Sequence, residues 1–518
     1  MTKTLDLSKL RSFFNNITKE KTVSALRSFF MGKWYPIWVA FSVLVGRFTG
    51  KEVYFAIIDI TLVIISLLVC DSIRPVLPNL ITFLYRIPLE HGPGAPYYSD
   101  YYTTEPMANV VVVVFAIFVV ALVYFYVKHK SFAGVNLIKL PLFIPLAILS
   151  LSFLTAGIFS GNRAKEDLGF AALQVLVFFV VYFILYFGLR RENMEELTDY
   201  FVYIAAMCAI VLSVEVFECY LKDATSIGSI LAAAKNVNFG WGISNTCGNV
   251  LSVLPPLCIL GVMRSKKLLR AIVYYGIAAL AFFATIMTTS RSAILVGGVG
   301  LVSAMIVSAF AGKQKWLSRL AILGVAMVAA AGVFLFKDKV MLLVDKVFSG
   351  GFSDNGRYRI WRIAISHFKD NPWFGNGHFS LNVGIQNSLF TPRLAHNTIF
   401  QILTSMGIFG IVSYLVYRVA GLFPFFKHFT PTKLVLLISC AVLVGESLLD
   451  NFIFWFNPLF VYNICIVLAV MHCEQAKPRD SEESDDNDDK TDDDITFTDN
   501  VIVHDSPITD SPTSTITV

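Results

Sequence analysis

The sequence predicts an all-α integral membrane protein, a polytopic bundle of about 12 to 14 transmembrane helices. Of its 518 residues, 56% are hydrophobic and only 15% are charged, and the mean hydropathy is +0.65. A soluble domain of this length cannot bury so much apolar surface. The apolar runs are longer than strands and do not alternate in polarity, so we expect helices and not a β-barrel.

The apolar runs that carry this prediction differ in length. Two of them, 75–89 and 249–263, fall short of the ~20 residues of a perpendicular span, and we expect that each could be re-entrant. The runs lie at 34–48, 53–70, 75–89, 107–127, 137–158, 168–188, 199–219, 249–263, 270–289, 292–311, 319–336, 398–420, 433–450 and 452–471.

The placement of Lys and Arg predicts the orientation. The basic segment 1–33 is expected in the cytoplasm, without a cleavable signal peptide because it is long and polar. Alternation through the transmembrane domain, 34–471, places the other basic loops on the same side. These loops contain Lys128, Lys130, Lys139, Arg190, Arg191, Arg264, Lys266, Lys267, Arg270, Lys313, Lys315, Arg319, Arg418, Lys427 and Lys433. The acidic segment 472–518 cannot bury a core and is expected to be a disordered cytoplasmic tail.

One loop departs from this rule. Residues 337–397 fall on the outer side, although they are rich in Lys and Arg and contain only four aspartates. Positive charge on the outer side opposes the topology, so a functional role such as anion binding is the better explanation.

Residues 355–377 within this loop predict an amphipathic helix that ends at Asn371-Pro372. Its apolar side follows helical spacing through Arg357, Ile360, Trp361, Ala364 and Phe368. Two interpretations stay open. The helix could lie in the membrane interface with its arginines reaching lipid headgroups, or Arg357 could point inward and bind a phosphate through its planar donors.

Two other polar elements lie where apolar runs begin. His396-Asn397 precedes the run at 398–420, and a histidine there suits proton transfer near neutral pH, although it could equally be a helix-end hydrogen-bonding residue. Arg291 lies in a very short junction between two runs. It must face protein, water or an anion, or else mark a simple bend.

The eight cysteines show no CxxC pair, and most lie in apolar runs, where a small buried side chain is the expected role. Cys219 and Cys247 flank one polar loop and could form a disulfide if that loop faces an oxidising compartment.

Taken together, SRSA at 290–293, GRYRIW at 356–361, DNPWFGNG at 370–377 and HNTIFQILTSMGIFG at 396–410 resemble the O-antigen ligase and O-antigen polymerase superfamily. The resemblance covers about residues 235–420. It implies a GT-C-like glycosyltransferase of the bacterial cytoplasmic (inner) membrane, with both termini in the cytoplasm and the large loop on the outer side. It also implies a catalytic role for Arg291, Arg357 and His396. The residues then expected to bind substrate are Asn397, Trp361, Arg359 and Arg362, the last two without an assured counterpart in the family.

This resemblance implies an inverting transfer or polymerisation of a glycan, from an undecaprenyl-diphosphate carrier onto an acceptor hydroxyl, in cell-surface polysaccharide synthesis. The acceptor, whether glycan, lipid or protein, is left open, and so is the choice between ligase and polymerase. We expect no metal, no cofactor and no nucleic-acid partner. One alternative is an enzyme that depends on Glu90, Asp100 or Glu105 in an outer loop. The other is a non-catalytic transporter of inorganic carbon or another solute, a role suspected for some relatives with this domain.

Overall fold

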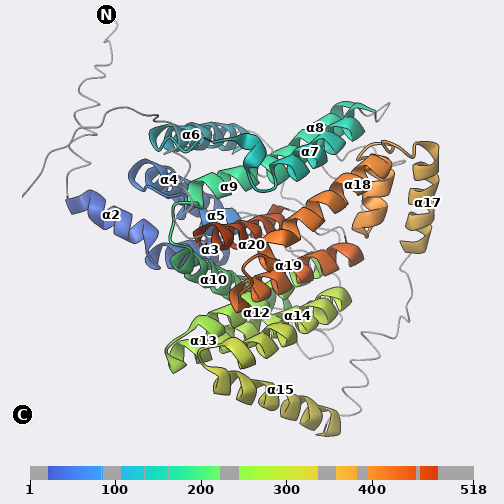
Figure 1. The fold of residues 1–518 in the computed structure, drawn as a ribbon. Coiled ribbons are helices and arrows are strands. Elements are labelled where there is room, and N and C mark those ends of the chain that lie inside the picture. Colours follow the sequence, from blue (N-terminus) through green and yellow to red (C-terminus); the bar gives the residue numbers. More distant parts are fainter. Residues whose placement is uncertain are drawn as a thin grey trace, which may run out of the picture. The chain divides into compact units, whose positions relative to one another are not determined.

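The computed structural model describes residues 21–82, 85, 107–132, 135–159, 164–221, 244–335, 357–381, 395–450 and 456–476. All regular secondary structure in these ranges is helical, which confirms the predicted fold class (Figure 1). The first part of the bundle contains α2 (Lys21–Met31), α3 (Trp34–Thr49), α4 (Glu52–Val69), α5 (Val76–Thr82), α6 (Met107–Lys128), α7 (Phe143–Ile158), α8 (Ala164–Val175), α9 (Val181–Leu189) and α10 (Met194–Leu221).

A short 3-10 helix, η3 (Leu137–Lys139), precedes α7, and a π-helical turn, η5 (Leu176–Val180), joins α8 to α9. The second part contains α12 (Ser244–Arg264), α13 (Leu268–Met287), α14 (Arg291–Ala311), α15 (Lys315–Leu335), α17 (Arg357–Asp370), α18 (Thr398–Phe426), α19 (Pro431–Leu449) and α20 (Phe456–Gln475).

Nine helices within the described ranges are long and apolar enough to cross a membrane, or ten if α2 and α3, which meet at a 70° bend, count as one span. This number is lower than the predicted 12 to 14. The difference comes from apolar runs whose described helices are short, such as the seven-residue α5 and the 16-residue α7. A seven-residue helix rises only about 10 Å. Most of the predicted run at 75–89 beyond α5 lies outside the described residues.

The run at 249–263, which is short for a perpendicular span, is part of a longer helix. α12 is 21 residues long and qualifies as a span, because the polar residues Ser244 to Asn249 extend the helix. All of these residues except Asn245 are buried, and α12 packs against α13, α14, α10 and α19, so protein and not lipid surrounds this helix. α12 is thus a central helix of the bundle.

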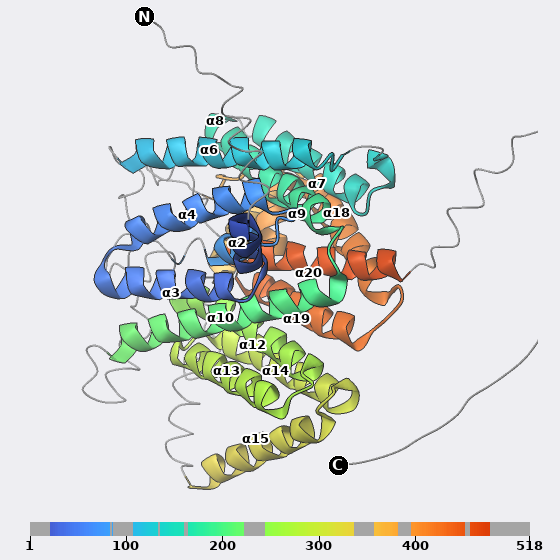
Figure 2. The same ribbon diagram turned by 90° about the vertical axis from the view of Figure 1, so that its left-hand side faces the viewer.

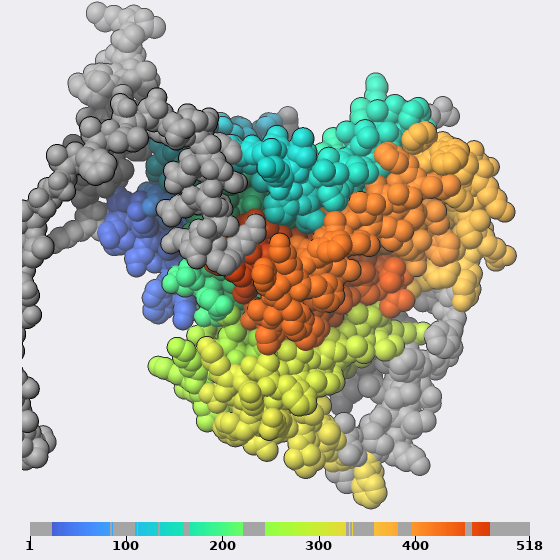
Figure 3. Space-filling view, viewed as in Figure 1, coloured from blue at the N-terminus to red at the C-terminus, as the bar shows by residue number. Residues whose placement is uncertain are grey.

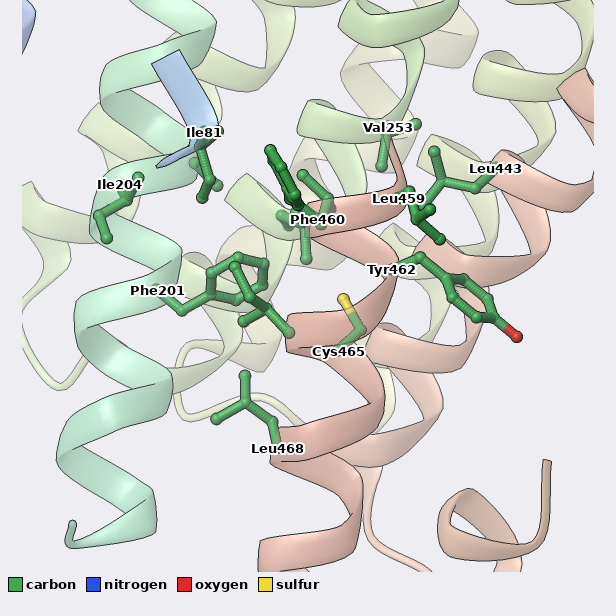
Figure 4. Packing of buried hydrophobic residues seen from close by; sticks show 14 of the residues in the cluster. Ile81, Phe201, Ile204, Val253, Leu443, Leu459, Phe460, Tyr462, Cys465 and Leu468 are labelled. Carbon is green, nitrogen blue, oxygen red and sulfur yellow. The ribbon is translucent and has the colours of Figure 1, made fainter. Parts of the chain in front are cut away.

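The apolar core continues from α12 to α20. Figure 4 shows side chains from four other helices packed around α20. They include Ile81 of α5, Phe201 and Ile204 of α10, Val253 of α12 and Leu443 of α19. α20 is therefore enclosed by segments from both halves of the chain.

The basic loops that the sequence placed on one side come together at one end of the bundle (Figure 2). Side chains and backbone groups join them through the pairs Lys128–Leu68, Arg190–Ser131, Arg74–Glu192, Arg264–Glu195, Lys313–Met263 and Gln475–Glu192. We call this the basic end. Arg27 of α2 also lies there, 2.9 Å from Asp71.

The assignment of Arg418 to a basic loop was wrong. α18 continues past residue 420 to Phe426, so Arg418 lies inside the helix. The apolar residues Leu422 to Phe426 extend the helix beyond the predicted run.

α18 is broken at Gly407, whose φ of 63° and ψ of −155° are not helical. The loop 371–377 fills the break. The amides of Asn376 and Gly377 donate to the carbonyls of Thr404 and Ser405 at 2.8 and 3.1 Å. In return, the amides of Ile408 and Phe409 donate to the carbonyls of Pro372 and Trp373, at 2.8 and 3.1 Å.

Two glycines permit this close approach. A Cβ on Gly375, which has a φ of +72°, would lie 2.3 Å from the backbone carbon of Ser405. A Cβ on Gly407 would lie 2.6 Å from the carbonyl oxygen of Pro372. The DNPWFGNG segment is therefore more than a turn after α17, because it fixes α17 to the first half of α18. In the space-filling view the two form one continuous flank of the protein (Figure 3).

Candidate functional site

α17 forms as the sequence predicts and ends at Asp370. Its apolar side packs on protein: Ala364 is fully buried with Leu381 and Ala395, beside Ile360 and Phe400. The Trp361 indole donates to the Ala395 carbonyl at 2.9 Å and stacks on Phe400, with ring centroids 5.0 Å apart. This packing favours the interpretation in which α17 belongs to the bundle over one in which it lies free on a lipid surface.

Arg357 is the first residue of α17 and leans toward the end of α19. Its Nη1 donates to the carbonyl oxygen of Leu449, the last residue of α19, at 2.9 Å. That carbonyl is free to accept because the C-terminal carbonyls of a helix have no intrahelical partner. Arg357 therefore caps α19 while keeping the other donors of its guanidinium group.

His396 and Asn397 reach the same end of α19 from α18. His396 Nδ1 lies 2.8 Å from Asp450 Oδ1, and both side chains are partly exposed, at 39% and 18%. Asn397 is the N-cap of α18, since its Oδ1 accepts from the amides of Ile399 and Phe400, and its Nδ2 donates to the Leu448 carbonyl at 2.8 Å.

This arrangement has a chemical consequence for His396. A carboxylate at Nδ1 accepts the Nδ1–H bond and leaves the lone pair of Nε2 free to take a proton from another molecule. The φ of His396 is 52°, in a region that non-glycine residues seldom adopt. The dyad is thus held by a specific backbone conformation directly before α18.

Arg291 is the first residue of α14. Its neighbours Ser290 and Ser292 connect the start of α14 to α19 through Asn249 of α12. Ser290 and Ser292 each lie 3.4 Å from the side-chain amide of Asn249 on α12. With its amide nitrogen facing α19, Asn249 donates to Glu446 Oε2 at 3.0 Å. Asn249, Glu446 and Ser290 are buried.

Arg357, His396 and the cluster beside Arg291 therefore meet at residues 446–450 of the chain, which we call the site end. Arg291 and Arg357 begin their helices and His396 directly precedes the N-cap of α18. Helix N-termini carry partial positive charge. The arrangement suits a negatively charged group.

The other predicted substrate-binding residues differ in environment. Arg359 and Arg362 are exposed on α17. Trp361 instead packs between α17 and α18, so its indole supports the helix. The alternative acidic residues Glu90, Asp100 and Glu105 lie outside the described residues. The Cys247 thiol is free in the structure, so the alternative disulfide with Cys219 is not formed.

Sequence reasoning missed Asp450, Glu446 and Asn249. Asp450 and Glu446 lie in the apolar run 433–450, where they are isolated polar residues. The available signal was their spacing of four residues, which places two carboxylates on one face of a helix. Within the described ranges, no group of three or more His, Cys, Asp or Glu side chains is arranged to hold a metal ion.

His378, which lies between α17 and His396 in the chain, has a different role. It is buried between the rings of Phe153 and Phe170, and its Nε2 lies 3.2 Å from the Phe153 carbonyl. Burial lowers the pKa of His378 to about 4. A neutral, enclosed imidazole anchors the 375–381 loop to α7.

A family model described as O-antigen ligase matches residues 276–415. The matched segment runs from α13 to the middle of α18 and includes Arg291, Arg357 and His396, whereas Asp450, Glu446 and Asn249 lie outside it. No curated protein was found to match the chain.

Proposed function

We propose that this protein transfers a glycan from a lipid diphosphate to an acceptor hydroxyl. The proposal starts from the family-model match at residues 276–415, which supports membership of the O-antigen ligase and polymerase superfamily. The family supports glycan transfer of the O-antigen ligase kind in general terms. The donor, the reaction geometry and the residues that act are our proposal. The observation that carries it is the meeting of Arg357, His396 and the Arg291 cluster at residues 446–450.

The leaving group decides what the site must supply. When a lipid diphosphate departs from the anomeric carbon of a sugar, negative charge grows on its bridging oxygen. Donors that meet this charge in the transition state accelerate the step, whereas equal binding of the ground state does not. In our proposal Arg291 and Arg357 supply this positive charge at two helix N-termini, without a divalent metal ion.

His396 acts as the general base in this proposal. Nε2 takes the proton of the acceptor hydroxyl, whose oxygen attacks the anomeric carbon as the bond to the diphosphate oxygen breaks. The configuration at that carbon is inverted, and the lipid diphosphate leaves. Asp450 is a positioning residue, because it orients the imidazole and stabilises the charge that the imidazole gains.

The remaining predicted residues have smaller roles here. Asn397 positions His396 by capping α18 and binding the Leu448 carbonyl. Arg359 and Arg362 are exposed and would attract the anionic donor toward the site end. Trp361 would bind substrate only through its exposed part, since its indole N–H is already satisfied.

We place the reaction at the outer face of a bacterial inner membrane. The support is the gathering of basic loops at the opposite end of the bundle, since such loops mark the cytoplasmic side. An undecaprenyl-diphosphate-linked glycan is the donor, and the acceptor is a glycan, lipid or protein. The position of the acidic tail in the cytoplasm follows from the same rule, although the tail lies outside the described residues.

The broken helix α18 is the observation that favours the alternative function, a transporter, because broken helices line many transport sites. In those sites the freed backbone groups face an ion or substrate. Here the freed groups of Thr404, Ser405 and Ile408 bind the 371–377 loop instead. The break therefore supports a structural junction, and we prefer the enzyme.

The test is transfer by the purified full-length protein, with a labelled lipid-diphosphate oligosaccharide as donor and with candidate acceptors. We expect His396→Ala and Arg357→Ala each to lower the rate by about 10²–10⁴-fold. Lys369→Ala removes an exposed charge at the other end of α17 and should change little. A ladder of products would identify a polymerase, and one shifted product a ligase. Unchanged transfer by folded His396→Ala and Arg357→Ala would refute the proposal.

A further inference from the structure

A second polar cluster lies in the half of α18 nearer the basic end, far along the helix from His396. We propose that Arg418, with Tyr182 and Tyr417, binds a phosphate group there, carried by a membrane lipid or present as the free ion. This site is separate from the candidate transfer site and does not depend on the proposed function.

The depth of Arg418 is the first observation. It precedes the end of α18 at Phe426 by eight residues (426 − 418), which corresponds to about 12 Å along the helix. An arginine at such a depth in a membrane-spanning helix is costly unless it meets a partner.

Aromatic rings surround the guanidinium group. Its central carbon lies 4.5 Å from the ring centroid of Tyr462, 4.7 Å from that of Tyr414 and 5.6 Å from that of Tyr417. In Figure 4, Tyr462 lies on the side of α20 away from Phe201. Such contacts stabilise a cation through the negative faces of the rings. These rings cover the faces of the guanidinium group, but they do not accept hydrogen bonds from the N–H groups at its edge.

The Tyr462 hydroxyl lies near enough to interact with the guanidinium group, but it does not complete a well-formed hydrogen bond with it. Nε, Nη1 and Nη2 of Arg418 are buried without a hydrogen-bond partner in the part of the chain that the structure describes. The same is true of the hydroxyl groups of Tyr182 and Tyr417, and Tyr417 interacts electrostatically with both Tyr182 and Arg418. Most buried polar groups in proteins are paired, so this cluster calls for a partner.

The chemistry of the cluster identifies that partner. Every group named can donate, and the cluster carries one positive charge, with no ion pair to Arg418 among the described residues. A water molecule would supply lone pairs but no charge. A phosphate supplies both, and arginine binds phosphate through strong, charge-assisted hydrogen bonds.

The exposed face of α18 beside Arg418 gives a phosphate group access to this cluster. Leu415, Val419 and Leu422 are exposed on α18 and share a helical face with Arg418. A lipid phosphate therefore approaches the cluster from the membrane beside this face. Phosphate from solution would enter from the basic end.

The test uses the full-length protein in detergent, with two measurements. Native mass spectrometry measures retained phospholipid, and thermal unfolding is compared in inorganic phosphate and in chloride. The variants are Arg418→Gln and the double variant Tyr182→Phe/Tyr417→Phe, which keeps the rings. Lys427→Gln, which removes an exposed charge at the basic end, is the matched control.

We expect the wild type and Lys427→Gln to retain an anionic phospholipid that Arg418→Gln loses. If Arg418→Gln does not fold, the double variant carries the test, with binding weakened roughly tenfold by the loss of two donors. Stabilisation of the wild type by inorganic phosphate alone, absent from the variants, would support the site with the free ion as its source. Equal lipid retention and equal phosphate response in all proteins would overturn the inference.

Discussion

His396 Nδ1 and Asp450 Oδ1 lie 2.8 Å apart although 54 residues separate them in the chain. The contact joins the start of α18 to the end of α19, at the point where Arg357 caps α19 through the Leu449 carbonyl. A carboxylate in this position fixes which imidazole nitrogen is available, so Asp450 bears directly on the proposed reaction.

Asp450→Asn should lower the rate of glycan transfer by about 10²–10⁴-fold while leaving the protein folded. An amide can favour the wrong imidazole tautomer and cannot stabilise the protonated ring. Initial rates of transfer by the variant and the wild type measure this effect.

The control for this variant is Asp450→Glu, which keeps the charge and should retain more activity than Asp450→Asn. Equal rates for Asp450→Asn and the wild type would show that the carboxylate does not act through His396.

Gly407→Ala and Gly375→Ala should each destabilise the protein and abolish transfer. Both glycines have positive φ, and the added Cβ would lie 2.3–2.6 Å from backbone atoms of the opposite segment. The backbone strain alone costs about 1–2 kcal/mol. Thermal unfolding in detergent measures the loss, with Gly324→Ala as the control, since a Cβ there meets nothing within 4 Å. A Gly407→Ala protein as stable as Gly324→Ala would contradict the junction.

Asn249 and Glu446 should behave as a coupled pair. Asn249→Leu leaves the buried Glu446 carboxyl group without its amide donor, which typically costs about 1–3 kcal/mol. Replacing both by Leu removes that penalty, so the double variant should be more stable than the sum of the single effects predicts. A double-variant cycle of unfolding temperatures measures the coupling, and simple additivity would argue against the contact. Transfer should stay impaired in the double variant, because the position of Arg291 depends on this cluster.

The protein should lose stability as the pH falls from about 6.5 toward about 4. Burial lowers the pKa of His378 in the folded protein to about 4, whereas an unfolded histidine has a pKa of about 6.5. Between these values the unfolded chain binds the extra proton, so the stability present at higher pH is lost on acidification. His378→Gln should flatten this part of the stability–pH curve. An unchanged curve in that variant would assign the acid sensitivity to other groups.

The amino-acid sequence determined the class of the protein and the identity of the candidate side chains. Long apolar runs require helices in a membrane, because the bilayer offers no partner for free backbone groups. The helical spacing from Arg357 to Phe368 predicted α17 correctly. Periodicity could not predict the length of α12, since its polar N-terminal residues are buried by other helices.

Only the tertiary structure decided how these side chains meet. Asp450 ends an apolar run, and nothing in its local sequence indicates that it faces His396. The break at Gly407 likewise depends on a loop that precedes it by some thirty residues, since backbone groups of both segments satisfy one another. Sequence periodicity is local, whereas contacts between distant segments depend on how the helices pack. The motifs could therefore be identified from the sequence. The hydrogen bonds at the end of α19 that bring them together could not.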